Sequence, residues 1–186
     1  AVPAGASAGV IGAGGGGLNA VQGARIVGAG PSIAVDIVAE KRQTARAFGA
    51  TATLDPTSGE LAAGVRGFTG GRGADYVLVT VGSKAAIEQG IGLLRRGGTL
   101  VIVGMPASGV TVDLDPASLA ADGQRVLGSK MGSSRIARDI PRLVELYRRG
   151  QLKLDELVSG RYPLTAINEA IADLRRGTAL RNVIVL

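Results

Sequence analysis

The residues best placed to do chemistry in this sequence are glycines and one carboxylate near the amino terminus. The stretch VIGAGGGGLNAVQGA, residues 10–24, contains Gly12, Gly14 and Gly17 in the spacing G-x-G-x-x-G. Asp36 follows at close to the separation of about 20 residues that accompanies this pattern in dinucleotide-binding folds. The first glycine permits a tight turn, the second lets a diphosphate approach the backbone, and the third lets a helix pack closely on a strand. The spacing therefore predicts a dinucleotide site.

The same stretch predicts which groups would hold the two halves of the ligand. Free N–H groups at the start of a helix bind anions, because the positive end of the helix dipole lies there. We expect Gly15, Gly16, Gly17 and Leu18 to supply these groups. The Asp36 carboxylate can accept hydrogen bonds from both adenosine ribose hydroxyls and would repel a 2′-phosphate, so NAD is expected rather than NADP.

Other catalytic sites are disfavoured by what the sequence lacks. It contains no cysteine and no histidine, which removes the ordinary zinc site, the commonest general base and the most reactive nucleophile. Gly5, Ser7 and Gly9 match the nucleophile-elbow spacing, but no histidine could activate the serine. There is no P-loop motif, and no tyrosine is followed by lysine four positions on. We therefore expect no catalytic residue and no metal ligand in this chain.

The elements that must position the glycines and Asp36 alternate regularly. Short, apolar, β-branched runs predict parallel strands covered on both faces, at residues 7–12, 32–36, 52–55, 75–82, 98–104 and 125–131. Helical patterns lie between them at residues 18–29, 40–50, 57–68 and 83–96. Ser83 is the expected N-cap of the last, and Thr57 and Glu60 have capping-box spacing. The order predicts an α/β fold with a six-stranded, doubly wound parallel sheet and helices on both faces.

The pattern changes after residue 132. A long helix is predicted up to residue 150, with Pro141 as a break or kink, then a helix over 161–177 and a final strand, NVIVL. We expect one domain over 1–150 and a helix–strand segment over 151–186. Arg-Arg-Gly follows three helical patterns, at Gly97, Gly150 and Gly177, as expected for cations in a last turn followed by a left-handed glycine.

Composition and charge narrow the function further. The chain is 46% hydrophobic with only 3% aromatic residues, so the core must consist of Ala, Val, Ile and Leu. The net charge of +6 invites a nucleic-acid role, but helix endings account for six arginines and no binding motif accompanies them. We therefore expect no nucleic-acid partner. No apolar run could span a bilayer and no leader is seen, so we also expect no membrane partner and a cytoplasmic protein. A start at Ala1, close to the first strand, suggests an excised piece or a processed product.

Several blocks together resemble the medium-chain, zinc-type alcohol dehydrogenases, most closely the formaldehyde-dehydrogenase-like branch. The resemblance covers essentially the whole chain. Its blocks, in order, are VIGAGGGGLNAVQGARIVGAG, IAVDIVAEKRQTARAFGAT, GGRGADYVLVTVGS, LLRRGGTLVIVGMP, GSKMGSS and ALRNVIVL. The resemblance implies a Rossmann coenzyme domain followed by a segment that returns to the catalytic domain.

The resemblance also implies further NAD contacts. Lys41 would lie along the adenosine ribose and adenine, and Thr80 and Val81 would flank the coenzyme. Backbone groups of Val103, Ser129 and Met131 would face the nicotinamide carboxamide. Arg181 would pair with the diphosphate, because a guanidinium matches phosphate oxygens in a bidentate way.

Departures from the family limit what this chain could do alone. The ligands of the catalytic zinc belong to a GroES-like domain that has no counterpart here, so zinc is expected only in that missing domain. The acidic residue usual in the strand at Val79 is absent, and Gly16 replaces a bulkier residue. Three hypotheses remain: the NAD-binding part of an alcohol dehydrogenase, inert alone; a free-standing NAD-binding or sensing module; and a structural dimer module. The strand Arg125–Met131 would be a sheet edge, which predicts a homodimer.

Overall fold

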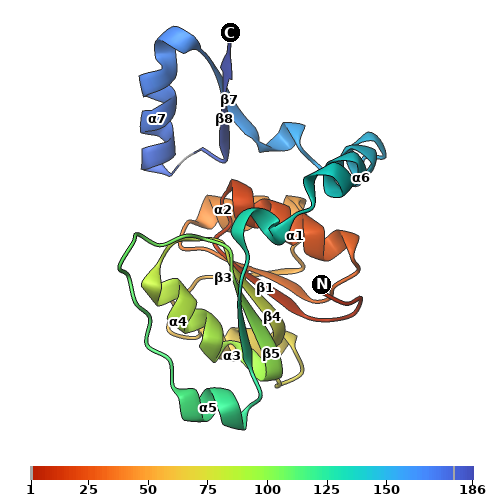
Figure 1. Ribbon diagram of the computed structural model, residues 1–186, viewed down its shortest axis with the longest axis vertical. Coiled ribbons are helices and arrows are strands. Elements are labelled where there is room, and N and C mark those ends of the chain that lie inside the picture. Colours follow the sequence, from red (N-terminus) through yellow and green to blue (C-terminus); the bar gives the residue numbers. More distant parts are fainter. Residues whose placement is uncertain (1, 178) are drawn as a thin grey trace. The chain divides into compact units, whose positions relative to one another are not determined.

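A single sheet of six parallel strands, in the order β3-β2-β1-β4-β5-β6, organises the first part of the chain (Figure 1). The strands are β1 (Ala8–Ile11), β2 (Ser32–Val35), β3 (Ala52–Leu54), β4 (Ala74–Val79), β5 (Leu94–Ile102) and β6 (Arg125–Gly128). All neighbouring strands pair in parallel. The strand order reverses between β1 and β4, which opens a crevice at their carboxyl ends. The predicted doubly wound sheet is confirmed.

Helices cover both faces of this sheet. Figure 1 shows α1 and α2 on one face, and α3 and α4 on the other. The helices of this part are α1 (Gly15–Ile26), α2 (Ala39–Ala47), α3 (Leu61–Phe68), α4 (Lys84–Gly92), α5 (Pro116–Ala121) and the 3₁₀ turn η1 (Lys130–Ser133). Ser83 caps α4 as predicted, its hydroxyl accepting from the N–H of Ala86.

The core lies between the sheet and these helices. It is built almost entirely from Ala, Val, Ile and Leu, as the composition predicts, with Phe48 the aromatic exception among the described residues. Val10, Ile33, Val77 and Leu100 on the strands have no exposed surface. β1 and β2 are buried along their whole length, as continuously apolar sequences predict for strands covered on both faces.

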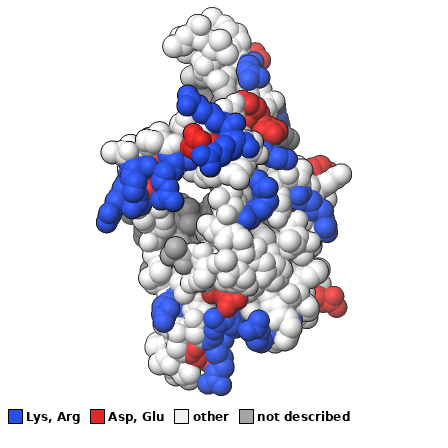
Figure 2. Space-filling model, turned by 90° about the vertical axis from the view of Figure 1, so that its right-hand side faces the viewer, with Lys and Arg blue, Asp and Glu red and all other residues white. Residues whose placement is uncertain are grey.

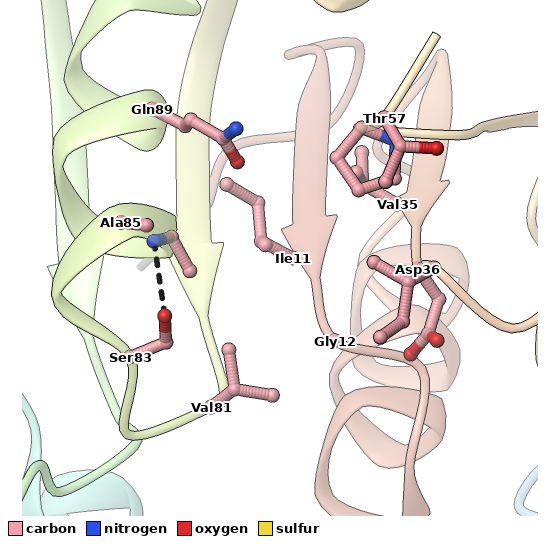
Figure 3. Close-up of a pocket in the computed structure, with 12 residues that line it drawn as sticks. Ile11, Gly12, Val35, Asp36, Thr57, Val81, Ser83, Ala85 and Gln89 are labelled. Carbon is pink, nitrogen blue, oxygen red and sulfur yellow. Dashed lines mark hydrogen bonds between the residues drawn. The ribbon is translucent and has the colours of Figure 1, made fainter.

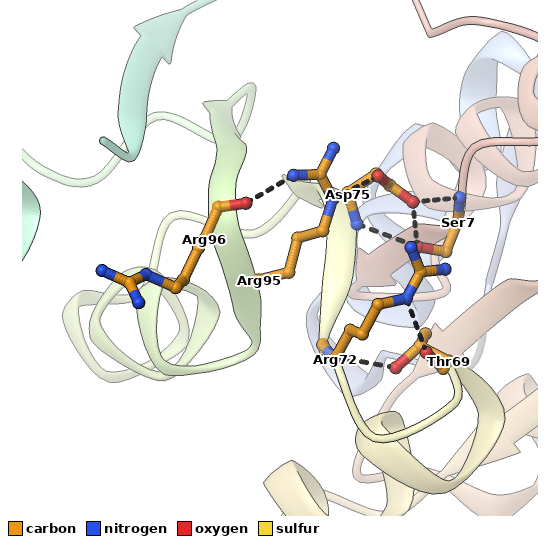
Figure 4. Close-up of polar contacts among 7 residues, drawn as sticks. Ser7, Thr69, Arg72, Asp75, Arg95 and Arg96 are labelled. Carbon is orange, nitrogen blue, oxygen red and sulfur yellow. Dashed lines mark hydrogen bonds and ion pairs between the residues drawn. The ribbon is translucent and has the colours of Figure 1, made fainter. Parts of the chain in front are cut away.

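Polar contacts fasten the amino ends of three strands to one another (Figure 4). The Asp75 carboxylate accepts from the hydroxyl and the N–H of Ser7, at 2.6 and 2.8 Å, and pairs with the guanidinium of Arg95. The Ser7 hydroxyl also accepts from the N–H of Asp75 at 2.8 Å. Ser7 is 3% exposed, so it is a buried structural residue at the amino ends of the strands, opposite the glycine turn.

The structure describes residues 2–177 and 179–186, and these fall into two compact units that divide after Ser134. The second unit, Arg135–Leu186, contains α6 (Ile136–Arg148), η2 (Asp155–Leu157), β7 (Val158–Pro163), η3 (Leu164–Ala166), α7 (Ile167–Arg176) and β8 (Arg181–Val185). β7 and β8 pair in parallel. The contacts thus divide the chain earlier than residue 150, and α6 belongs to the second unit.

Several predicted boundaries were wrong. α3 begins at Leu61, because Thr57 donates its hydroxyl to Asp55 at 2.6 Å instead of capping a helix. α6 continues through Pro141 without a break, and residues 161–163 are strand, not helix.

The Arg-Arg-Gly pattern predicts two of the three helix endings correctly. Gly150 and Gly177 both have positive φ after α6 and α7. Arg95 and Arg96, however, lie in β5, because α4 has already ended at Gly92 and the buried Leu93 and Leu94 lead directly into that strand.

Charged side chains are dispersed over the surface. On the face in Figure 2, Lys and Arg form several separate groups with Asp and Glu among them. Within the described part of the chain, no helix is long and apolar enough to cross a membrane.

Candidate functional site

The glycine turn lies where β1 leads into α1, at the point where the strand order reverses. Gly12 has φ +93°, a conformation that a residue with a side chain rarely adopts. A Cβ on Gly12 would lie 2.5 Å from Cγ1 of Val81, and one on Gly17 would lie 1.7 Å from the carbonyl oxygen of Gly12. Both positions therefore require glycine, for the reasons that the motif predicts.

The first turn of α1 presents free backbone amides. Gly14 is the N-cap, and its carbonyl accepts the first intrahelical bond, from the N–H of Leu18 at 2.8 Å. The N–H groups of Gly15, Gly16 and Gly17 precede this bond and have no acceptor within the helix. Apart from adjoining residues and the backbone of α1 itself, a Cβ on Gly14 or Gly16 would meet no described atom within 4 Å, so the turn is open around these two positions.

The assignment of a free N–H to Leu18 was wrong. The helix begins at Gly15, three residues earlier than expected, so the amide of Leu18 is already inside the hydrogen-bonded part. Its side chain is completely buried and contributes to the core.

Asp36 lies immediately after β2 and faces the glycine turn (Figure 3). One carboxylate oxygen accepts from the N–H of Ala13 at 2.7 Å and the other from the N–H of Val38 at 2.8 Å. These bonds fix the carboxylate beside the turn. Each oxygen retains a second lone pair, so a diol could still bind both.

A cavity of about 360 Å³ lies beside Asp36 at the carboxyl ends of the strands. Figure 3 shows Val81, Ser83 and Gln89 on one side of it, and Asp36 and Thr57 on the other. The full lining is Ile11, Gly12, Val35, Asp36, Ile37, Pro56, Thr57, Val81, Ser83, Ala85, Ala86 and Gln89. A mostly apolar slot with one carboxylate at its rim suits a flat, weakly polar ring attached to a diol.

Thr80 and Val81 lie at the end of β4, as the resemblance implies. Val81 lines the cavity and is 36% exposed. The Thr80 hydroxyl instead points to two backbone acceptors, the carbonyl oxygen of Gly12 at 2.8 Å and that of Ile11 at 3.0 Å. Its visible role is to hold the glycine turn against β4.

The loops after β4 and β5 touch through glycine. A Cβ on Gly82 would lie 2.3 Å from the carbonyl oxygen of Met105, and one on Gly104 would lie 2.3 Å from the backbone of Val81. The amides of Val103 and Gly104 both donate to the carbonyl of Val79 at 2.9 Å. Sequence reasoning missed Gly82 and Gly104 as site residues, although each follows an apolar strand in the motifs TVGS and IVGMP.

A second cavity, of about 400 Å³, lies at the ends of β5 and β6. Val103 and Ser129 line it, as do Met105 and Lys130. Met131 lies next in the chain with φ +50° and is 83% exposed. The structure thus brings Val103 and Ser129 to one cavity.

Lys41 and Arg181 are less closely tied to the cavities. Lys41 lies in the first turn of α2, half-buried. Arg181 begins β8 in the second unit and is exposed. Its proposed contact with a diphosphate stays a prediction.

Four further residues near Asp36 were missed. Ile37, Thr57 and Gln89 line the cavity, and Arg42 donates to the carbonyl of Asp36 at 2.6 Å. Thr57 was assigned to a helix, which hid its position. Arg42 lies one residue beyond Lys41, and only the helical turn of α2 shows that it reaches back to the strand end.

The chain offers no metal centre in the part that the structure describes. No group of three or more His, Cys, Asp or Glu side chains gathers there. The residues present therefore do not fit a catalytic zinc ion.

Comparison with known proteins places this site in a wider context. The sequence profile described as zinc-binding dehydrogenase matches residues 15–149. The NDMA-dependent alcohol dehydrogenase of Amycolatopsis methanolica is 42% identical over 187 residues, covering 99% of this chain and 50% of that protein. The chain thus spans about half the length of the curated relatives it matches.

Solved structures of dehydrogenases superpose closely on this chain. The alcohol dehydrogenase zinc-binding domain protein of Burkholderia ambifaria superposes with a TM-score of 0.95 at 38% identity, covering 100% of this chain and 50% of that one. A zinc-binding dehydrogenase of Sinorhizobium meliloti, solved bound to NADP, superposes with a TM-score of 0.90 at 29% identity, covering 100% and 54%.

Proposed function

Because this chain belongs to the zinc-binding dehydrogenase family, we propose that it is the coenzyme-binding part of an alcohol dehydrogenase and presents NAD(H) for hydride transfer. The observation that carries the proposal is the meeting of free α1 amides and the Asp36 carboxylate at one edge of the sheet. An anion site and a diol site side by side match a diphosphate joined to a ribose.

The residues of the first unit fit the adenosine half of NAD. The amides of Gly15, Gly16 and Gly17 would hold the diphosphate, with no side chain in the way at Gly14 or Gly16. Asp36 would accept from the ribose hydroxyls, and Lys41 would lie alongside. The cavity lined by Ile37, Val81 and Gln89 would take the adenine.

The second cavity suits the nicotinamide half. Backbone groups of Val103, Ser129 and Met131 would orient the carboxamide, and Arg181 would add a contact to the diphosphate. Bound NAD supplies the hydride acceptor. This chain's contribution is to bind the coenzyme and to fix which face of the ring is offered.

Asp36 supports NAD over NADP within this proposal. A 2′-phosphate would lie against a carboxylate that two backbone N–H groups hold in place. Repulsion between like charges would then disfavour NADP.

Calorimetry with the two coenzymes tests the proposal. We expect NAD to bind more tightly than NADP, and Asp36→Asn to weaken NAD by about tenfold and to narrow the preference. Asp122→Asn removes the same charge from the Arg96 pair at the amino ends of the strands and should change neither affinity. Unchanged affinities in Asp36→Asn would contradict the ribose assignment. Failure of the unmodified chain to bind either coenzyme would favour the third hypothesis, a structural module.

In this proposal alcohol activation is assigned to residues outside this chain, since the described residues form no cluster of metal ligands. We therefore expect no alcohol oxidation by the chain with NAD and added zinc. Turnover in that assay would show that the chain carries catalytic groups of its own. A cytoplasmic location is part of the same proposal and can be checked by cell fractionation.

We also propose a homodimer through β6. This strand is the sheet edge, and Leu127 on it is 52% exposed. An open apolar edge tends to pair with another strand, and a charge there discourages pairing. Light scattering after size exclusion should give a dimer, and Leu127→Lys should give a monomer. A concentration-independent monomer for the unmodified chain would contradict the proposal.

A further inference from the structure

An ion pair between Arg42 and Asp55 lies next to Asp36, whose carboxylate is proposed to hold the ribose. Arg42 donates from one terminal nitrogen to the backbone carbonyl of Asp36 at 2.6 Å. The same nitrogen lies 3.0 Å from a carboxylate oxygen of Asp55, which follows β3. The two side chains are only 20% and 32% exposed. A guanidinium is thus held next to Asp36, but its charge is matched by Asp55.

Two further hydrogen bonds hold the Asp55 carboxylate in place. Its other oxygen accepts from the hydroxyl and the N–H of Thr57, at 2.6 and 2.8 Å. These two bonds, more than the nearby Arg42, lower the pKa of Asp55, so the carboxylate is ionised at neutral pH. Asp36 and Thr57 line the same cavity, and Arg42 and Asp55 connect these two residues from behind the lining.

We propose that Asp55 is a second determinant of coenzyme choice, which acts by neutralising Arg42, the cation that donates to the backbone carbonyl of Asp36. This inference rests on the proposed function, since it needs the adenosine ribose at Asp36. A 2′-phosphate would then meet two obstacles: the Asp36 carboxylate repels it, and Arg42 is already paired. A free guanidinium binds phosphate strongly through two parallel hydrogen bonds, whereas one engaged by a carboxylate does not.

The inference predicts that removing Asp36's charge alone is not enough to admit NADP. Asp36→Asn should raise the affinity for NADP by no more than about threefold, because Arg42 remains neutralised. Adding Asp55→Asn should raise it by about tenfold more, as a bidentate phosphate contact becomes available. Asparagine keeps an acceptor oxygen for Thr57, so the turn after β3 is preserved. A further Arg42→Gln should remove the gain.

The experiment is calorimetry on the 186-residue chain with three probes: NAD, NADP and adenosine 2′,5′-bisphosphate. The bisphosphate should follow NADP through the variant series, and NAD should stay within about threefold of its value in Asp36→Asn. Asp36→Asn combined with Asp122→Asn is the matched control, because it has the same net charge change at the other edge of the sheet. Thermal unfolding of each variant checks that it is folded.

Three outcomes would overturn the inference. They are an equal gain from Asp122→Asn, a gain that survives Arg42→Gln, and no gain from Asp55→Asn in a folded protein. If the double variant does not fold, Arg42→Gln in the Asp36→Asn background decides: NADP affinity should not change, and a fall would show that Arg42 was already available. If the unmodified chain binds NAD but the series fails, this inference alone is wrong. If it binds neither coenzyme, the proposed function fails and this inference with it.

Discussion

Single glycines in the turn between β1 and α1 have separate tasks that the structure distinguishes. Gly12 and Gly17 are required by close contacts, whereas Gly14 and Gly16 face open space. The sequence predicts the first two and Asp36 from spacing alone, because the motif encodes backbone geometry. It does not predict that Gly15–Gly17 are helical, since glycine is a poor helix former and the helix start depends on packing against Gly12. That is why the Leu18 amide was misassigned.

Gly16→Ala and Gly17→Ala form a matched pair at this scale. A Cβ at position 17 must displace the Gly12 carbonyl, so Gly17→Ala should lower the free energy of unfolding by about 1–3 kcal/mol and abolish coenzyme binding. Gly16→Ala should leave stability equal or raise it by up to about 1 kcal/mol, with its amide still available. Urea unfolding and calorimetry check both. Equal destabilisation by the two substitutions would contradict this account of the turn.

Helices and strands of the first unit are largely predictable, because continuous apolar β-branched runs mark buried parallel strands. β7 was missed because VSGRYP is of mixed polarity and its residues alternate between half-buried and exposed, so no buried run marks it. The start of α3 was missed because an Asx turn at Asp55 uses the hydroxyl that the capping box would need. Local hydrogen-bond competition of this kind is not visible in residue spacing.

Glycines within helices give a prediction at the scale of the element. Gly23 lies inside α1, and a Cβ there would meet no described atom within 4 Å apart from adjoining residues and the backbone of α1 itself, so Gly23→Ala should stabilise the protein by about 0.5–1 kcal/mol. In α4, a Cβ on Gly90 would lie 2.7 Å from the side chain of Leu100. Gly90→Ala should therefore leave the stability of the protein unchanged or lower it, because the added methyl group pushes α4 away from the sheet. Urea unfolding of both variants measures the difference, and a stabilised Gly90→Ala would show that this helix is loosely packed.

At the scale of the whole molecule, a stabilising polar network and the proposed coenzyme site lie at opposite ends of the strands of one sheet. The amino edge holds the network of Ser7, Asp75 and Arg95, and the carboxyl edge holds the glycine turn and both cavities. The sequence predicts the carboxyl edge as the site, because ligands bind where the strand order reverses. It does not predict the amino-edge network, since Arg95 was assigned to a helix end. The assignment of 151–186 to a segment that returns to a catalytic domain stays a prediction.

Asp75 makes stability depend on pH. Partial burial would raise its pKa, but the Ser7 hydroxyl and N–H and the Arg95 guanidinium outweigh this and lower the pKa to about 2, from 3.8. Because the folded pKa is the lower one, the carboxylate stabilises the fold above about pH 4, and this contribution is lost as the pH falls towards 2. With the side chain 15% exposed, the contribution is about 2 kcal/mol at neutral pH and about half that at pH 3.

Urea unfolding of Asp75→Asn between pH 7 and pH 3 tests this contribution. The variant should be about 2 kcal/mol less stable at pH 7, and the difference from the unmodified chain should shrink as the pH falls. Asp113→Asn is the control, because Asp113 is 91% exposed beside Lys84 and such pairs contribute under about 1 kcal/mol. A difference that stayed constant across this pH range would mean that packing, not charge, is what Asp75 provides.

Gly82 lies against the carbonyl of Met105 and Gly104 against the backbone of Val81, so the loop that lines one hollow at the carboxyl ends of the strands touches the loop that lines the other. Neither glycine can acquire a methyl group without shifting the opposing loop. A substitution in one of these loops that reshapes one hollow will therefore disturb the other, so the two hollows have to be redesigned together.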